Sequence, residues 1–437
     1  MTALPATEIA EVTALTLEGR GVLRPAGKRV LVPGALAGEE VAYQRRRRRR
    51  NYDEGVLVEV RRASPDRVPP GCEYFGKCGG CSLQHLSPDA QLAMKQATLI
   101  DSFARIADLT PAEVLPPVRG AVWGYRRKAR LGVRHVEKKG RVLVGFRERG
   151  SSFVADMATC HVLVAQVARL IEPLGRLIGG LTLSRRLPQV EVAAGDRGAI
   201  LVLRTLDPPT TGDRAALRAF AADHGVTLCL QPGDEATIIG LDGAPPPDLT
   251  YALPEYDLEF AFGPTDFVQV NGPLNRRLVA AAMALLDPQP DATVLDLFCG
   301  LGNFTLPLAR HAGRVIGLEG SAALVARAAA NAARNGIGNA TFAVRDLYRG
   351  DPGPLVPAGT RVDQVLLDPP RTGAGRALPA LAALGARRIA YVSCNPATLA
   401  GDAAELVRHH GYRLQAAGAV DMFPHTAHAE ALALFGK

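Results

Sequence analysis

The last part of the chain alternates short apolar runs with longer segments whose apolar residues recur every three or four positions. The apolar runs include TVLDLFCG, RVIGLEG, QVLLDPP and RIAYVSC, and SAALVARAAANAARNG is typical of the segments between them. Continuous apolar runs bounded by turn residues indicate buried strands, and their alternation with helices indicates βαβ units. We therefore expect a doubly wound parallel α/β sheet, whose ligands lie beyond the carboxyl ends of its strands.

Two other patterns precede this sheet. Near the N-terminus, the runs KRVLVPG, EEVAYQ and EGVLVEVRR are separated by glycines and predict the strands of a small β-barrel. Prolines at 65, 69 and 70 then mark a connector. From about residue 118 to 262, strand-like runs mix with helical segments, which is typical of an α+β domain. We expect three domains, over residues 1–62, 63–262 and 263–437.

Composition places the chain among ordinary globular proteins. It has 437 residues, of which 47% are hydrophobic, and no apolar stretch reaches the length of about 18 residues that a membrane helix needs. The first residues lack the basic and apolar regions of a secretion signal. We expect a soluble, cytoplasmic monomer with no membrane partner. In that compartment, cysteines are candidates for metal binding or catalysis rather than disulfides.

A net charge of +8, supplied mainly by arginine, favours a polyanionic partner such as RNA. Arg45–Arg50 form an unbroken basic run flanked by Tyr43 and Tyr52. A basic loop with aromatic neighbours on a small barrel suits phosphate contact and base stacking, although a solvated loop that binds nothing is the alternative. A second basic group either faces RNA or forms the solvent face of a strand: Arg126, Arg127, Lys128 and Arg130.

Three cysteines gather in the segment CEYFGKCGGC. Cys72, Cys78 and Cys81 need a fourth partner to close a metal site, and Cys160 is the candidate because Cys229 lies on an apolar strand and belongs to a core. Zinc ribbons usually supply two C-x-x-C pairs, whereas this chain has one. Clustered cysteines with a remote fourth favour an iron–sulfur cluster, with zinc as the alternative.

The ends of the predicted parallel strands carry a turn and three acids. Gly300 and Gly302 permit a tight turn and the close approach of a ligand, but their spacing departs from the pattern of dinucleotide-binding folds. Glu319, Asp346 and Asp368 end successive strands. A single acid there is often only a helix cap. Three together suit S-adenosylmethionine, whose adenosine and amino-acid parts they can hold.

Cys394 ends the strand RIAYVSC, where Asn395 and Pro396 stop it. Taken alone, such a thiol is more often a small buried hydrophobe, but at the ligand edge of a sheet it is a candidate nucleophile. Cys299 also ends a strand, and its glycine neighbours indicate packing against the cofactor. Enzymes that methylate amino groups can place an aromatic residue after D-P-P, whereas Arg371 stands there in this chain.

Four blocks resemble the signatures of the RNA uracil-5 methyltransferases: LDLFCGLGNFTLPLA, LLDPPRTG, YVSCNPATLA and MFPHTAHAE. The resemblance covers nearly the whole chain. LVPGALAGEEV is similar to the TRAM domain, an oligonucleotide-binding type of barrel, and CEYFGKCGGC with the distant Cys160 is similar to the ligands of the family's [4Fe–4S] cluster. YRRKARL and GFRERGSS are most similar to the branch that methylates 23S ribosomal RNA at uridine 1939.

The resemblance implies an N-terminal TRAM barrel, a central α+β domain with an iron–sulfur cluster, and a Rossmann-like class I methyltransferase sheet. It implies that Cys394 is the nucleophile and Glu430 the base. The residues implied to bind S-adenosylmethionine are Gln269, Phe298, Asn303, Glu319, Asp346 and Asp368, and those implied to bind the cluster are Cys72, Cys78, Cys81 and Cys160.

The chemistry agrees with these roles. Carbon 5 of uracil is too weak a nucleophile to take a methyl group until a thiolate adds to C6, and a carboxylate can later remove the C5 proton. We therefore expect methyl transfer to a uridine of 23S rRNA through a covalent adduct between Cys394 and C6. The alternative substrates are another ribosomal position or transfer RNA. A noncatalytic RNA-binding iron–sulfur protein would need neither Glu319 nor the pair formed by Cys394 and Glu430.

Overall fold

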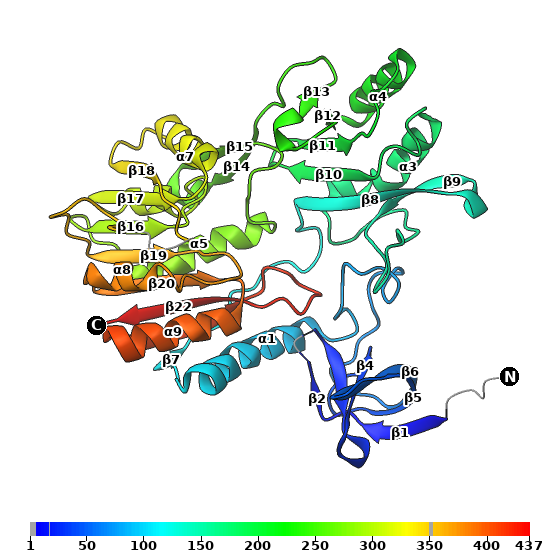
Figure 1. The fold of residues 1–437 in the computed structure, drawn as a ribbon, viewed down its shortest axis with the longest axis horizontal. Coiled ribbons are helices and arrows are strands. Elements are labelled where there is room, and N and C mark those ends of the chain that lie inside the picture. Colours follow the sequence, from blue (N-terminus) through cyan, green and yellow to red (C-terminus); the bar gives the residue numbers. More distant parts are fainter. Residues whose placement is uncertain (1–5, 17, 349–352) are drawn as a thin grey trace. The chain divides into compact units, whose positions relative to one another are not determined.

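The computed structural model describes residues 6–16, 18–348 and 353–437, which fold into two compact units (Figure 1). Unit 1 comprises Met1–Lys95, Phe146–Ala155 and Phe423–His428. Unit 2 comprises Gln96–Gly145, Asp156–Met422 and Ala429–Lys437. Among the described residues, no helix is long and apolar enough to cross a membrane.

Unit 1 is built around one six-stranded sheet with the order β1-β5-β6-β4-β3-β2. The strands are β1 (Thr7–Glu11), β2 (Ala14–Leu15), β3 (Arg20–Leu23), β4 (Arg29–Pro33), β5 (Glu40–Arg48) and β6 (Tyr52–Arg62). Helix α1 (Pro88–Ser102) begins in unit 1 and continues into unit 2. Alternate residues of the strands point into a small core that contains Leu23, Val30, Val32 and Val41. This sheet agrees with the predicted barrel strands.

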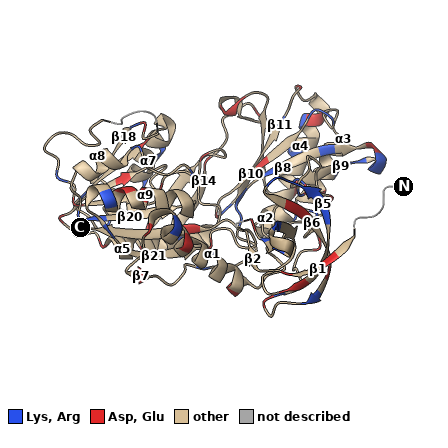
Figure 2. Ribbon diagram, turned by 60° about the horizontal axis from the view of Figure 1, so that its bottom comes forward, with Lys and Arg blue, Asp and Glu red and all other residues tan. Residues whose placement is uncertain are grey.

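The prediction of a basic loop at Arg45–Arg50 is wrong for most of the run, because β5 continues to Arg48 (Figure 2). Tyr43 is fully buried and its hydroxyl donates a hydrogen bond to Glu8 over 2.7 Å, so it cannot stack on a base. Arg45 pairs with both Glu8 and Asp53 at 2.7 Å. The hydrogen bond from Lys28, together with Arg45, lowers the pKa of Asp53 to about 2. Arg45 is therefore part of the sheet's internal ion-pair network.

The first part of unit 2 is a second six-stranded sheet, with the order β13-β12-β11-β10-β8-β9. Its elements are β8 (Lys128–Val136), β9 (Arg141–Gly145), α2 (Ala165–Ala168), α3 (Ile171–Gly180), β10 (Gln189–Ala194), β11 (Ala199–Arg204), α4 (Thr211–His224), β12 (Thr227–Gln231) and β13 (Ile239–Gly240). A capping box between Thr210 and Asp213 starts α4, and Gly225 ends it in the left-handed conformation. Cys229 is fully buried on β12, as predicted.

Two of the basic residues near the start of β8 are tied to other parts of unit 2 rather than extended into solvent. Arg127 pairs with Asp196 at 3.3 Å, and its guanidinium lies 5.6 Å from the ring centre of Tyr251. The ammonium of Lys128 donates to the carbonyl of Asp266 over 2.5 Å, and burial lowers the pKa of this lysine. The alternative that Arg127 and Lys128 form the solvent face of a strand is therefore wrong, and contact with RNA stays a prediction. Arg130 is exposed.

Unit 2 also contains an eight-stranded sheet with the order β18-β17-β16-β19-β20-β22-β21-β7 (Figure 1). The first five strands of this order, β18, β17, β16, β19 and β20, run parallel to one another. Strand β22 is antiparallel to both of its neighbours, β20 and β21. The strands are β7 (Glu113–Val114), β16 (Thr293–Leu297), β17 (Arg314–Glu319), β18 (Ala340–Val344), β19 (Gln364–Leu367), β20 (Arg388–Ser393), β21 (Arg413–Val420) and β22 (Glu430–Gly436). The doubly wound sheet is therefore confirmed, and its strand order reverses between β16 and β19.

Helices cover this sheet, and an antiparallel hairpin precedes it. These elements are β14 (Leu249–Leu253), β15 (Leu258–Phe262), α5 (Gly272–Leu286), α6 (Thr305–Ala309), α7 (Ala322–Arg334), α8 (Leu378–Ala383) and α9 (Pro396–His410). The division into three domains stays a prediction. The three large sheets lie mainly in the three predicted stretches, but β7 comes from the middle stretch and joins the C-terminal sheet through β21.

Candidate active site

Four parallel strands bring predicted site residues to one edge of the C-terminal sheet. Leu297 of β16 is level with Leu318 of β17 and with Leu367 of β19. The residues that follow are therefore neighbours, so Glu319 and Asp368 lie on either side of the turn that begins at Phe298. The thiol of Cys394 follows the end of β20, next to β19.

The turn after β16 is formed by three residues with left-handed backbone conformations: Phe298, Gly300 and Gly302 have φ of 64°, 55° and 97°. The amide of Gly300 donates to a carboxylate oxygen of Glu319 over 3.2 Å, and the amide of Ser321 donates to the other oxygen over 2.9 Å. The side chain that caps α7 belongs to Ser321. Glu319 is therefore oriented by two backbone amides and does not serve as the cap.

Asn303 lies in the same turn and belongs to a buried amide network. It exchanges hydrogen bonds with Asn275 of α5 at 2.8 and 3.0 Å and accepts one from the hydroxyl of Tyr251 at 2.9 Å. Gln269 lies between β15 and α5 and is half-buried. The neighbouring carbonyl of Val270 accepts from the amide of Arg127 over 2.9 Å. No contact described in the structure joins Gln269 to the acids.

Sequence reasoning missed two residues at this edge. Asp296 of β16 is fully buried, accepts a hydrogen bond from the Thr305 hydroxyl at 2.5 Å, and keeps its other oxygen without a described hydrogen-bond partner. Burial raises its pKa to about 8, and that of Asp368 to about 7. An acid inside the apolar run TVLDLFCG was a signal for Asp296.

Tyr348 is the second missed residue, and no sequence pattern marks it. Its ring centre lies 5.1 Å from that of Phe298, and its amide donates to the Asp346 carboxylate over 2.9 Å. Burial raises the pKa of its phenol, and the charges of Glu319, Asp368 and Asp346 raise it further. These neighbours connect Asp346 and Phe298 to the same edge.

Cys394 and Glu430 face each other across an antiparallel strand pair. Ser393 of β20 is level with Ala431 of β22, so the next residue on β20 is opposite the preceding one on β22. Glu430 is 6% exposed, whereas Cys394 is half-buried. Burial raises the pKa of the Cys394 thiol to about 11. The charges of Glu430 and Asp368 add to this rise, while Arg371 opposes it.

Cys299 lies in the turn after β16, and its sulfur packs against β17. It is 5% exposed, and a side-chain carbon at Gly317 of β17 would lie only 2.9 Å from its sulfur. Burial raises the pKa of its thiol well above the usual value. Cys299 is thus a buried packing residue, and its packing against the cofactor stays a prediction.

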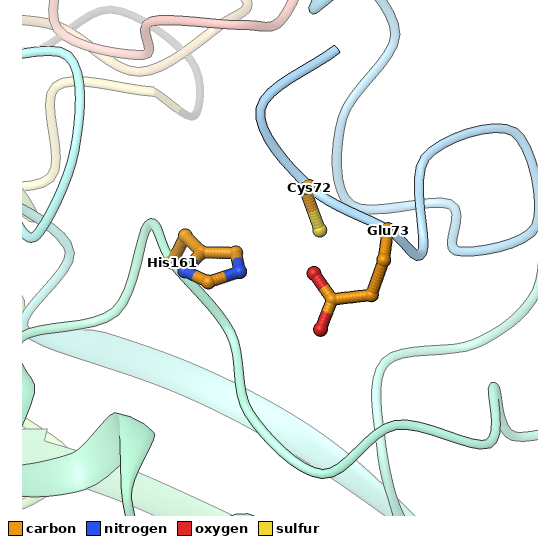
Figure 3. Close-up of side chains that lie close together, drawn as sticks. All are labelled: Cys72, Glu73 and His161. Atoms are coloured by element: carbon orange, nitrogen blue, oxygen red, sulfur yellow. The ribbon is translucent and has the colours of Figure 1, made fainter.

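The predicted cluster cysteines are divided between the units. Cys72, Cys78 and Cys81 lie on one loop of unit 1, while Cys160 is buried in unit 2. Figure 3 shows Cys72 with its neighbour Glu73, and also His161, which follows Cys160 in unit 2. The residue pattern did not reveal that residues 146–155 pack on the cysteine loop in unit 1.

Hydrogen bonds fix this packing. The amide of Gly79 donates to the carbonyl of Arg147 over 2.8 Å, and the guanidinium of Arg149 donates to the carbonyl of Cys81 over 2.9 Å. The amide of Gly80 points at the sulfur of Cys78, 3.4 Å away. None of the seven cysteines, all of which lie in the described part of the chain, forms a disulfide.

Comparison with known proteins identifies the family. A family model described as tRNA (Uracil-5-)-methyltransferase matches residues 250–346 and 358–437. The 23S rRNA (uracil(1939)-C(5))-methyltransferase RlmD of Alkalilimnicola ehrlichii is 51% identical, over 98% of this chain and 96% of its own length. The protein of the same name from Methylococcus capsulatus is 49% identical, over 99% of this chain and 98% of its own. The chain belongs to the RNA uracil-C5 methyltransferase family.

A solved structure shows that the whole family fold is present. The tRNA (uracil-54, C5)-methyltransferase of Pyrococcus abyssi, solved with S-adenosyl-L-homocysteine, superimposes with a TM-score of 0.74 at 24% sequence identity. The match covers 98% of this chain and 100% of that one. The eight-stranded sheet of unit 2 is thus the class I methyltransferase sheet. The segments matched by the family model contain all eight residues predicted for catalysis and methyl-donor binding.

The electrostatics of Cys394 give a first prediction. Glu430→Gln removes a negative charge that raises the thiol pKa, so more thiolate forms at a given pH. A fall of one pKa unit gives about tenfold more thiolate below the pKa, and we expect alkylation of Cys394 by iodoacetamide at pH 9 to speed up about three- to tenfold. The rate is measured by mass spectrometry of the Cys394 peptide.

Glu405→Gln is the matched control, because Glu405 lies on α9 with a side chain that is 39% exposed. It should leave the alkylation rate unchanged. A Glu430→Gln protein that reacts no faster than this control would contradict the described pairing of Glu430 and Cys394.

Proposed function

We propose that this protein transfers the methyl group of S-adenosylmethionine to C5 of a uridine in 23S ribosomal RNA. The observation that carries the proposal is the placement of Cys394 opposite Glu430, beside an edge lined by Glu319 and Asp368. The target position, equivalent to uridine 1939, is supported by the names of relatives about 50% identical over nearly the whole chain. The predicted cytoplasmic location stays a prediction.

The acid-rich edge suits a cationic methyl donor. Asp296 and Asp368 have raised pKa values because they are buried without a compensating positive charge, and a bound cation would favour their ionised forms. We assign the binding of S-adenosylmethionine to six residues. They are Gln269, Phe298, Asn303, Glu319, Asp346 and Asp368. Glu319, which two amides hold in place, is suited to accept hydrogen bonds from ribose hydroxyls.

When bound, S-adenosylmethionine would supply an electrophilic methyl group, whose bond to the donor's sulfur breaks on transfer so that S-adenosylhomocysteine leaves. The sulfur of Cys394 forms a bond to C6 of the uracil, which makes C5 nucleophilic enough to take that methyl group. Glu430 then accepts the C5 proton, the C5–C6 double bond forms again, and the bond between Cys394 and C6 breaks. The target base must leave its stack to reach a thiol at the end of a strand.

Unit 1 supplies a surface for RNA. Arg46, Arg47 and Arg48 on β5 are exposed, unlike Arg45, and we propose that they contact the phosphate backbone. Transfer RNA is the alternative substrate, because the family model and the Pyrococcus abyssi structure carry tRNA names. The high identity of the 23S-specific relatives over both units favours ribosomal RNA.

The covalent mechanism predicts opposite results for two variants. Cys394→Ala should form no adduct with substrate RNA, because no thiolate can add to C6. Glu430→Gln should accumulate a protein–RNA adduct in the presence of S-adenosylmethionine, because removal of the C5 proton is slowed by about 10² to 10⁴-fold. Both are measured as slowly migrating bands on denaturing gels with labelled RNA.

Cys299→Ala is the control for the identity of the nucleophile and should still form and resolve the adduct. An adduct that persists in Cys394→Ala, or that disappears in Cys299→Ala, would refute the assignment.

We also propose that Cys72, Cys78, Cys81 and Cys160 bind a [4Fe–4S] cluster. The donor set fits: three thiols lie on one short loop, and the amide that points at Cys78 is the kind of donor that stabilises a metal-bound thiolate. Methyl transfer needs no electron, so we assign the cluster a structural or RNA-positioning role.

The cluster proposal is tested by anaerobic purification or reconstitution. Wild-type protein should contain about four irons and four sulfides per chain, with the visible absorption of an iron–sulfur centre. Cys78→Ala should lose this absorption, whereas Cys229→Ala, a fully buried cysteine of the β12 core, should keep it. Zinc in place of iron, or full iron content in Cys78→Ala, would contradict the proposal.

A further inference from the structure

The loop between β19 and α8 carries Arg371 and is tied to the nucleophile's own strand end. The side-chain amide of Asn395, the residue after Cys394, donates to the carbonyl of Arg371 over 3.1 Å. Asn395 also caps α9 by accepting from the amide of Ala397. The backbone around Arg371 therefore has a fixed relation to Cys394.

At Ala374, the C-terminal end of this loop contacts a buried group of polar side chains. The amide of Ala374 donates to a carboxylate oxygen of Asp402 over 2.7 Å and contacts the hydroxyl of Tyr391 at 3.2 Å. The Tyr391 hydroxyl donates to the same Asp402 oxygen over 2.5 Å. Tyr391 is fully buried and Asp402 is 8% exposed. We call these three groups the Tyr391–Asp402 junction; it joins β20, α9 and the loop.

The loop is pressed closely against this junction. Gly373 has a φ of 80°, and a side-chain carbon there would lie 2.7 Å from the Asp402 oxygen. Only glycine permits both the conformation and the approach. The surroundings are otherwise apolar, since the same core contains Leu378, Leu399 and Leu406. Burying polar groups in such a core costs desolvation free energy, which their hydrogen bonds must offset. The network therefore serves mainly to fix one geometry of the loop.

The groups acting on the Cys394 thiol show why this geometry matters. Glu430 from β22 and Asp368 from the end of β19 oppose the thiolate, and the phenol of Tyr348 is also close enough to interact with Cys394. Arg371 is the cation that favours the thiolate. An arginine on a loop can oppose these carboxylates only if the loop holds its guanidinium in place.

We propose that Tyr391 and Asp402 are positioning residues, which hold the 371–374 loop so that Arg371 activates Cys394. The proposal rests on the assignment of Cys394 as the nucleophile. It adds two buried residues that influence the nucleophile without contacting either the RNA or the methyl donor. If Tyr391 acts on Cys394 only through Arg371, its substitution should have no effect once Arg371 has been replaced. A double-mutant cycle tests this dependence.

The test is the rate of iodoacetamide alkylation of Cys394 at pH 9, followed by mass spectrometry of its peptide. It uses the full-length holoprotein without RNA or methyl donor, so a failure here is distinguishable from a failure of methyl transfer. Arg371→Gln should slow alkylation about three- to fivefold, because Arg371 lowers the thiol pKa by less than Glu430 raises it. Tyr391→Phe should slow it about two- to threefold, since it can lose no more than the effect of Arg371 itself.

Tyr412→Phe is the matched control. Tyr412 is 1% exposed in the same core and donates its hydroxyl hydrogen bond to the carbonyl of Ala386 over 2.8 Å, so its loss weakens the fold similarly. It should alkylate at the wild-type rate. Gly373→Ala provides a second route to the same effect without touching Tyr391, and should also slow alkylation.

The double variant Arg371→Gln/Tyr391→Phe should react no more slowly than Arg371→Gln alone. Wild-type alkylation rates in both Tyr391→Phe and Gly373→Ala would overturn the proposal and leave the junction a purely structural feature. If the double variant instead loses rate by the product of the two single-variant factors, the claim that Tyr391 acts through Arg371 is overturned.

Discussion

The parallel pairing of β17, β16, β19 and β20 is the constraint on which the site depends. Parallel strands end at one edge, and the register that sets Leu297 level with Leu318 and Leu367 puts Glu319 and Asp368 on either side of the first turn. A slip of one residue in any pair would turn these side chains to the other face of the sheet. The antiparallel β22 then adds Glu430 opposite Cys394.

This edge gathers acidic side chains and keeps them from water. Burial raises the pKa values of Asp296 and Asp368 and keeps the Cys394 thiol protonated in the absence of ligands. The site is therefore matched to a cation and needs local help to form a thiolate. In our proposal, Arg371 gives that help, and the Tyr391–Asp402 junction keeps Arg371 in place. Electrostatics and packing thus act on the same sulfur.

Much of this could be predicted from sequence, because strand ends can be recognised locally. The apolar runs that end at Glu319, Asp368 and Cys394 identified the sheet and its ligand edge. Features that depend on pairing between distant segments could not be predicted. Arg45 looked like part of a free basic run, but β5 pairs with β1 and brings it to Glu8. For Arg127 the sequence left RNA contact and a solvent-facing position open, and the structure places it over Tyr251. The packing of residues 146–155 on the cysteine loop could not be predicted either, because it also joins segments that are distant in sequence.

The central claim is that Cys394 and the acids around it methylate C5 of one uridine in 23S rRNA. The most direct test incubates unmodified 23S rRNA with the protein and S-adenosylmethionine labelled in its methyl group, and then maps the label. We expect a single labelled 5-methyluridine at the position equivalent to 1939, and none with Cys394→Ala. Label on another kind of base, or on uridine with Cys394→Ala, would contradict the claim.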